Sequence, residues 1–161
     1  MNLEELTKIK SVFIYSLNGT HLISHYYSNF IPESEENTFE KSIFKRALDD
    51  QFGEIMQHDE YIVIYKLIGD VFIFVVGGLN SNELLLAEVA DTMSTALSLV
   101  FKGKVDSKAI MKQIDLLYLL LDETIEQGLL FEGDPEVIAA RTKLRNDGAF
   151  LGKAIRAITG F

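Results

Sequence analysis

Residues 61–76, YIVIYKLIGDVFIFVV, consist of two apolar segments on either side of Gly69-Asp70. Both segments are rich in β-branched and aromatic residues, which favour strands. Glycine in the first position suits a two-residue turn of type II′ and predicts an antiparallel hairpin. The second segment, VFIFVV, does not alternate between apolar and polar residues, which is typical of a central strand covered on both faces. This stretch therefore predicts an antiparallel sheet between two layers of helices.

A second hairpin is predicted closer to the N-terminus. Residues 11–17 (SVFIYSL) and 20–27 (THLISHYY) have the composition of strands and are separated only by Asn18-Gly19. Both of these residues adopt positive φ readily, so we expect a two-residue turn of type I′. A further short strand is predicted at residues 53–57. Strands joined by tight turns pair antiparallel, which gives a five-stranded antiparallel sheet.

Four helices are predicted around this sheet. Apolar side chains recur at helical spacing over residues 34–49, 84–101 and 106–127. Asp134-Pro135 predicts the start of a fourth helix, with an N-cap followed by proline at the first helical position, and we expect it to end near residue 145. The first helix is expected on one face of the sheet and the later helices on the other. The predicted fold is α/β, of the α+β type, with one domain over residues 1–145 and a C-terminal tail over residues 146–161.

The composition limits the kinds of function that the chain can have. Its net charge is −9 and it contains no cysteine, so it repels nucleic acid as a whole and cannot form a disulfide or thiolate site. The N-terminus has no basic segment followed by an apolar one, as a signal peptide would. The apolar runs fall well short of the ~20 residues that span a bilayer. We expect a soluble, cytoplasmic protein that touches membrane only as part of a larger assembly.

The segment at residues 114–121, IDLLYLLL, is too apolar for a lone surface helix. At about 100° per residue, Ile114, Leu117, Tyr118, Leu121 and Ile125 lie on one side of a helix. We expect these five to pack on the sheet, and the remaining leucines, 116, 119 and 120, to face the other way. A helix that is apolar on both sides is normally buried on both sides. Two explanations are open: the fourth helix or the tail covers the leucines, or a partner chain does.

No pattern in the sequence predicts a catalytic or metal site. His21 and His25 are four residues apart on a strand, which separates their Cα atoms by roughly 13 Å, too far to share a metal. His58 falls in a polar turn, and Gly77-Gly78 lacks the spacing of a phosphate-binding loop. The acidic pairs, Asp122-Glu123 among them, are interpreted as surface charge. We therefore expect no enzyme activity, no cofactor and no metal.

The order and spacing of several motifs resemble the longin-like small subunits of vesicle coats, and within that group the zeta subunits of the coatomer. The resemblance covers roughly residues 10–145. Its strongest segment is LDETIEQGLLFEGDPEVIAAR, residues 121–141. The shorter motifs are FEKSIF at residues 39–44, VIYK at 63–66 and NEL at 82–84. The sigma subunits of clathrin adaptors share Asp122-Glu123 and Gly128 but usually lack the Asp-Pro start of the last helix.

The resemblance implies a non-catalytic coat subunit. It implies a stable pair with the large gamma subunit, recruitment of the assembled coat to Golgi membranes and coated vesicles by an Arf-family GTPase, and roles in Golgi-to-ER and intra-Golgi transport. The candidate partner-binding residues are Leu116, Leu119, Leu120, Tyr26 and Phe131. Two alternatives stay open: a sigma subunit of a clathrin-type adaptor, and a free-standing longin-type trafficking regulator. Dileucine-signal binding, a sigma property, is not expected, because Ile68, Ser94 and Lys104 stand where that apolar pocket would be.

Overall fold

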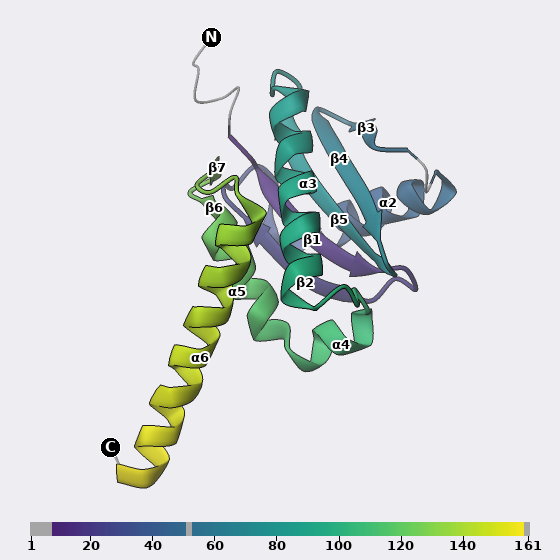
Figure 1. Ribbon diagram of the computed structural model, residues 1–161. Coiled ribbons are helices and arrows are strands. Elements are labelled where there is room, and N and C mark those ends of the chain that lie inside the picture. The colour runs from purple at the N-terminus through teal and green to yellow at the C-terminus, as the bar shows by residue number, and fades with distance from the viewer. Residues whose placement is uncertain (1–7, 51–52, 160–161) are drawn as a thin grey trace.

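The computed structural model of the protein describes residues 8–50 and 53–159, which form a sheet with helices on both faces (Figure 1). The five strands lie in the order β2-β1-β5-β4-β3, and every neighbouring pair is antiparallel. Their bounds are β1 Ser11–Ser16, β2 His21–Tyr26, β3 Ile55–His58, β4 Tyr61–Ile68 and β5 Val71–Gly78. The five-stranded antiparallel sheet predicted from the hairpin signals is confirmed.

The centre of the sheet is buried from both sides. In β5, residues Val71, Ile73 and Val75 face one apolar cluster, and Phe72 and Phe74 face the other. All five are fully buried, because strand side chains alternate between the two faces and both faces are covered. The prediction that VFIFVV forms a central strand is therefore confirmed.

The helices divide into two layers. Helix α2, Glu33–Asp49, packs its apolar side on the face that carries Phe72 and Phe74. Helix α3, Glu83–Val100, covers the opposite face, together with α4 (Ser107–Lys112), α5 (Ile114–Thr124) and the first part of α6 (Pro135–Thr159). The predicted start of α6 is confirmed, since the Asp134 carboxylate accepts a hydrogen bond from the Glu136 N–H at 2.9 Å.

The first hairpin has a different turn from the predicted one. Only Gly19 has positive φ, +92°, and Asn18 does not, so the turn is not of type I′. The Gly19 N–H donates to the Ser16 carbonyl at 3.0 Å, and the strand register shifts between Ile14 and Tyr15. A turn followed by a glycine of positive φ and a bulge is the usual three-residue alternative. The Asn18 side chain stabilises it by accepting hydrogen bonds from the N–H and hydroxyl of Thr20.

The predicted helix over residues 106–127 is wrong in two places. Gln113, with φ −130° and ψ 44°, separates α4 from α5. Helix α5 then ends at Thr124, and β6 (Ile125–Glu126) pairs with β7 (Leu129–Leu130). The two turn residues, Gln127 and Gly128, both have positive φ, +52° and +82°, which meets the requirement of a type I′ turn. The Ile9 N–H also donates to the Gly128 carbonyl at 2.6 Å, which holds this small hairpin against the start of β1.

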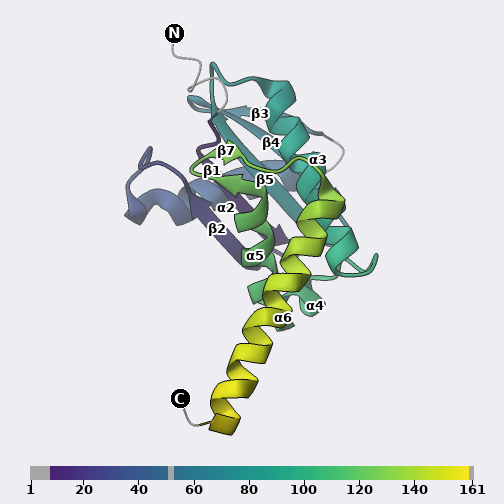
Figure 2. The ribbon, with the colours of Figure 1, turned by 60° about the vertical axis from the view of Figure 1, so that its left-hand side comes forward.

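Helix α6 is longer than predicted. It continues past residue 145 to Thr159, and its distal half projects beyond the rest of the molecule (Figure 2). Isolated glycines such as Gly148 cost a helix only about 1 kcal/mol, which the surrounding helix-favouring residues offset. Across residues 8–50 and 53–159, no helix combines the length and the apolar character that crossing a bilayer requires. The division into a domain of residues 1–145 and a tail stays a prediction.

The expected leucine face of α5 needs correction. Leu116 and Leu120 are 7% and 0% exposed, because α5 packs against both α3 and α6. Leu119 is half-buried, and Tyr118, which was expected in the core, is 46% exposed. Two explanations for the apolar leucines were left open. For Leu116 and Leu120 the first is right, because helices of the same chain cover them. Neither side chain has surface to offer to a partner in this structure.

Candidate partner-binding site

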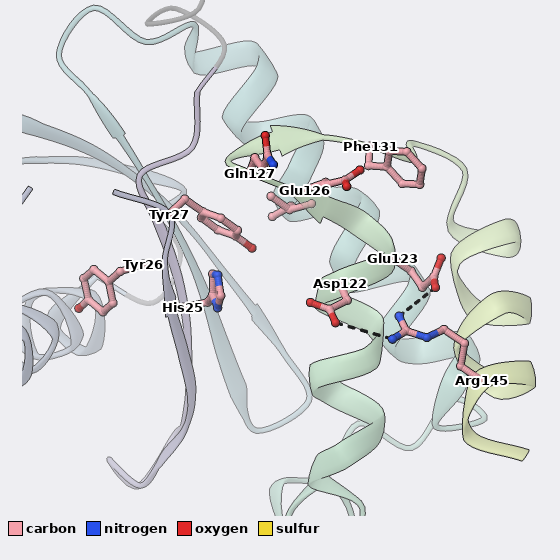
Figure 3. Close-up of a pocket in the computed structure, with 10 residues that line it drawn as sticks. His25, Tyr26, Tyr27, Asp122, Glu123, Glu126, Gln127, Phe131 and Arg145 are labelled. Atoms are coloured by element: carbon pink, nitrogen blue, oxygen red, sulfur yellow. Dashed lines mark hydrogen bonds and ion pairs between the residues drawn. The ribbon is translucent and has the colours of Figure 1, made fainter. Parts of the chain in front are cut away.

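A groove of about 560 Å³ lies where β2, the end of α5, the β6–β7 hairpin and α6 come together (Figure 3). It brings together aromatic, acidic and basic side chains from parts of the chain that are far apart in sequence. Its lining residues are His25, Tyr26, Tyr27, Asp122, Glu123, Ile125, Glu126, Gln127, Phe131 and Arg145.

The strand alternation of β2 decides which of its aromatic residues face this groove. His25 and Tyr27 lie on the α5 side, with their ring centroids 4.4 Å apart. Tyr26 points to the opposite side, where its hydroxyl donates to the buried carboxylate of Glu40. Burial, and next the negative charge of Asp122, raise the pKa of Tyr27. Tyr27 is therefore neutral and offers an apolar face and a hydroxyl group.

The opposite wall is acidic. Asp122 and Glu123 lie in the last turn of α5, and Glu126 follows in β6. Arg145 of α6 reaches between the first two: its guanidinium lies 3.0 Å from the Glu123 carboxylate and 3.8 Å from that of Asp122. Three carboxylates and one guanidinium leave two negative charges, 3 − 1 = 2, along this wall.

Phe131 lies at the rim of the groove. It follows β7, its side chain is 57% exposed, and its N–H donates to the Thr124 carbonyl at 2.8 Å. Thr124 is itself fully buried and donates its hydroxyl to the Leu120 carbonyl. The backbone that carries Phe131 is therefore held firmly, while the ring faces solvent. Large aromatic side chains on a fixed backbone are frequent contributors to protein interfaces, so Phe131 stays a candidate contact residue.

The structure brings together only two of the five predicted site residues. Tyr26 and Phe131 both line the groove, although Tyr26 points away from its centre. Leu116 and Leu120 are buried, and Leu119 lies outside the lining. Partner binding by Leu119, Tyr26 and Phe131 stays a prediction.

Sequence reasoning missed the other members of the groove. Asp122 and Glu123 were interpreted as ordinary surface charge, and Glu126 was placed inside a helix. The spacing of His25 and Tyr27 was a usable signal, because residues two apart on a strand share a face. Nothing in the sequence pointed to Arg145, since its contact with α5 depends on how α6 crosses that helix.

The histidines do not form a metal site. Among the described residues, no three His, Asp or Glu side chains are grouped so as to hold a metal ion. The His21 ring lies 2.6 Å from the Ser24 hydroxyl, and the His25 ring packs against that of Tyr27 at a tilt of 54°. Burial lowers the pKa of His58, whose ring lies 3.0 Å from the Arg46 guanidinium. Each histidine is thus accounted for by local contacts.

Comparison with known proteins defines the class of protein to which this fold belongs. Residues 8–149 match the family model of the clathrin adaptor complex small chain. The chain therefore belongs to this family of small subunits of vesicle coats. Within it, the chain is similar to coatomer subunit zeta-3 of Oryza sativa subsp. japonica, with 34% identity over 140 residues, 84% of this chain and 79% of the relative. Coatomer subunit zeta-2 of Mus musculus is 31% identical over 91% of this chain and 71% of its own length.

A structural neighbour with low sequence identity also supports the fold. A chain in a homology model of the full-length AP-3 complex in a stretched open conformation superimposes with a TM-score of 0.74 over 91% of this chain and 98% of its own. The sequence identity is 14%, so this likeness concerns the fold alone. It agrees with the longin-like architecture that the sequence predicted.

Proposed function

We propose that this chain is a zeta-type small subunit of the coatomer and that it pairs with the large gamma subunit. The observation that carries the proposal is the similarity to coatomer zeta subunits over 84–91% of the chain. The family model matches residues 8–149, which include the sheet, both helical layers and the groove. A sigma subunit of a clathrin adaptor is less favoured, because these relatives are zeta subunits.

The proposed role is structural. The chain completes the coat without catalysing a reaction, and an Arf-family GTPase brings the assembled coat to Golgi membranes for Golgi-to-ER and intra-Golgi transport. The chain itself is cytoplasmic and reaches the membrane only through the coat. The lack of a grouped metal site among residues 8–50 and 53–159 is compatible with this role.

The proposed partner surface includes Phe131 and Leu119, with Tyr26 at its edge. Phe131 is the strongest member, because it is exposed and its backbone is fixed. Substituting it with Asp removes an apolar contact and adds a charge, so we expect at least about a tenfold loss of affinity for the gamma subunit. Leu84→Asp is a matched control, since Leu84 is 80% exposed on α3 and lies outside the groove.

Co-expression with an affinity-tagged gamma subunit tests the proposal. Gamma is expected to co-purify in equal amounts with the wild-type chain and with Leu84→Asp, and in much smaller amounts with Phe131→Asp. If the wild-type chain captures a clathrin-adaptor large subunit from cytosol instead, it is a sigma subunit. If it elutes alone as a single monodisperse species and captures neither, the free-standing regulator is the better description.

A further inference from the structure

The acidic wall of the groove has charge that the residues described by the structure do not neutralise. Among the described residues that line the groove, Arg145 is the only lysine or arginine, and it is shared between Asp122 and Glu123. Asp122 keeps 68% of its side-chain surface exposed. Glu126 forms no ion pair within the described part of the chain. The wall therefore has room and charge for a second cation.

The facing wall suits a planar cation. The rings of His25 and Tyr27, tilted at 54° to each other with centroids 4.4 Å apart, lie across the groove from the carboxylates (Figure 3). A guanidinium group binds carboxylates through a planar fork of N–H donors and also stacks on aromatic rings, whereas an ammonium group does only part of this. Arg145 already shows that these carboxylates accept a guanidinium in this setting. Phe131, at the rim, adds an apolar contact for a neighbouring side chain.

On grounds of charge, residues 1–7 and a second copy of the chain are poor candidates to occupy this groove. Residues 1–7, MNLEELT, contain two glutamates and no lysine or arginine. A second copy of the chain would bring another net charge of −9 to an acidic surface. Charge complementarity instead favours a basic segment of a different polypeptide.

We propose that this groove receives an arginine-bearing segment of the large partner subunit, with the arginine between the Asp122–Glu126 wall and the rings of His25 and Tyr27. This inference rests on the proposed function, because it assumes that the chain pairs with a large subunit. The proposed interface then has two contacts: the apolar one at Phe131, and an arginine of the partner held by carboxylates and aromatic rings.

Two variants of the full-length chain, paired with the gamma subunit, test the inference. Glu126→Lys reverses an exposed charge on the wall, and His25→Ala removes one ring. Glu60→Lys is the matched control: it makes the same charge change at an exposed position beside β3, at the opposite edge of the sheet. The dissociation constant of each pair is measured at about 0.05 M and about 0.5 M salt, where screening differs strongly. Thermal unfolding of each free variant shows that it is folded.

We expect Glu126→Lys to weaken pairing at least about tenfold at low salt and to reduce the loss of affinity between low and high salt. His25→Ala is expected to weaken pairing by a smaller factor, and Glu60→Lys to leave it within about twofold of wild type. If Glu126→Lys and Glu60→Lys have the same dissociation constants for gamma while the wild-type chain still pairs with it, the inference is overturned and the proposed function stands. If the wild-type chain does not bind gamma at all, the proposed function fails and the inference falls with it.

Discussion

At the scale of single residues, Glu40 connects α2 to the first two strands. It is 3% exposed, and its carboxylate accepts hydrogen bonds from the hydroxyls of Tyr15, Ser24 and Tyr26. Removing the carboxylate leaves buried hydroxyls without their acceptor, and hydrogen bonds to a charged group contribute about 1.5–3 kcal/mol each. We expect Glu40→Ala to lower the free energy of unfolding by about 2–4 kcal/mol.

Urea unfolding of Glu40→Ala measures this effect against Glu35→Ala. Glu35 is on the same helix but exposed, so its replacement is expected to change stability by less than about 0.5 kcal/mol. Similar midpoints for the two variants would mean that the Glu40 network contributes no more than a surface carboxylate does.

Buried tyrosines make stability depend on alkaline pH. Burial first, and then Glu40, raise the pKa values of Tyr15 and Tyr26, and burial raises that of Tyr27. In the unfolded chain a tyrosine releases its proton near pH 10. Above that pH the unfolded state binds fewer protons than the folded state, so the free energy of unfolding falls as pH rises. Below about pH 9 these tyrosines are protonated in both the folded and the unfolded state, so they do not make the free energy of unfolding depend on pH.

We therefore expect the denaturation midpoint to be flat up to about pH 9 and to fall from about pH 10 upward. Tyr15→Phe should be less stable at neutral pH and show a shallower alkaline decline. Tyrosinate absorbance measured alongside circular dichroism checks the cause. Full tyrosine ionisation while the protein is still folded would contradict it.

Residue orientation shows where sequence reasoning succeeds and where it stops. Alternation along a strand is enough to put Tyr26 and Tyr27 on opposite faces, because it depends only on neighbouring residues. The partner of each side chain is a long-range matter: Tyr26 meets Glu40 of α2, and Asp122 meets Arg145 of α6. Neither pair of residues has a fixed separation in the sequence that a pattern could detect. The groove could therefore not be predicted before the packing of the helices was known.

At the scale of elements, alanine substitutions at two glycines can distinguish the cost of backbone strain from the cost of a steric clash. Gly69 and Gly103 both have positive φ, +58° and +80°. A Cβ on Gly69 would lie 2.0 Å from the Val105 carbonyl oxygen, whereas one on Gly103 would meet nothing within 4 Å. We expect Gly103→Ala to cost about 1 kcal/mol from φ alone. Gly69→Ala should cost a further ~1–3 kcal/mol, because the β4–β5 turn must move away from residue 105.

Thermal or urea unfolding of the two alanine variants measures the difference. Gly69→Ala is also expected to disturb α4, since the neighbouring Asp70 carboxylate accepts hydrogen bonds from the N–H and hydroxyl of Ser107. Equal destabilisation by both substitutions would show that the close approach to Val105 relaxes without cost.

Element type was easier to predict than element ends. The strands of the sheet were found because their β-branched and aromatic runs are long and bounded by turn residues. The segment after α3 was predicted as one helix because its apolar spacing continues through Gln113 and Ile125. The break at Gln113 and the change to a hairpin at Ile125 arise from packing: Gly128 bonds to Ile9, a residue more than a hundred positions earlier. Tertiary contacts here override local helix preference.

At the scale of the whole molecule, helices cover both faces of the sheet, and the long helix α6 extends away from it. Residues 137–142 of α6 include Ile138 and Thr142, which are fully buried against the body. Beyond residue 145 the side chains described are half-buried or exposed, Ile158 among them at 85%. Among the described side chains of α6, those that contribute to the core lie in its first part, and the helix then extends away from the sheet (Figures 1 and 2).

This division predicts the result of truncation. A chain that ends after Arg145 keeps the buried residues Ile138 and Thr142 and the contacts of Arg145 with Asp122 and Glu123. We expect its free energy of unfolding to lie within about 1 kcal/mol of the full chain. A chain that ends after Gly133 loses Ile138 and uncovers Leu116 and Leu120, which should unfold it or make it aggregate. Urea unfolding and size-exclusion chromatography of both truncated chains measure this. A loss of several kcal/mol on removing residues 146–161 would make the distal helix part of the domain, because only burial against the body produces a loss of that size.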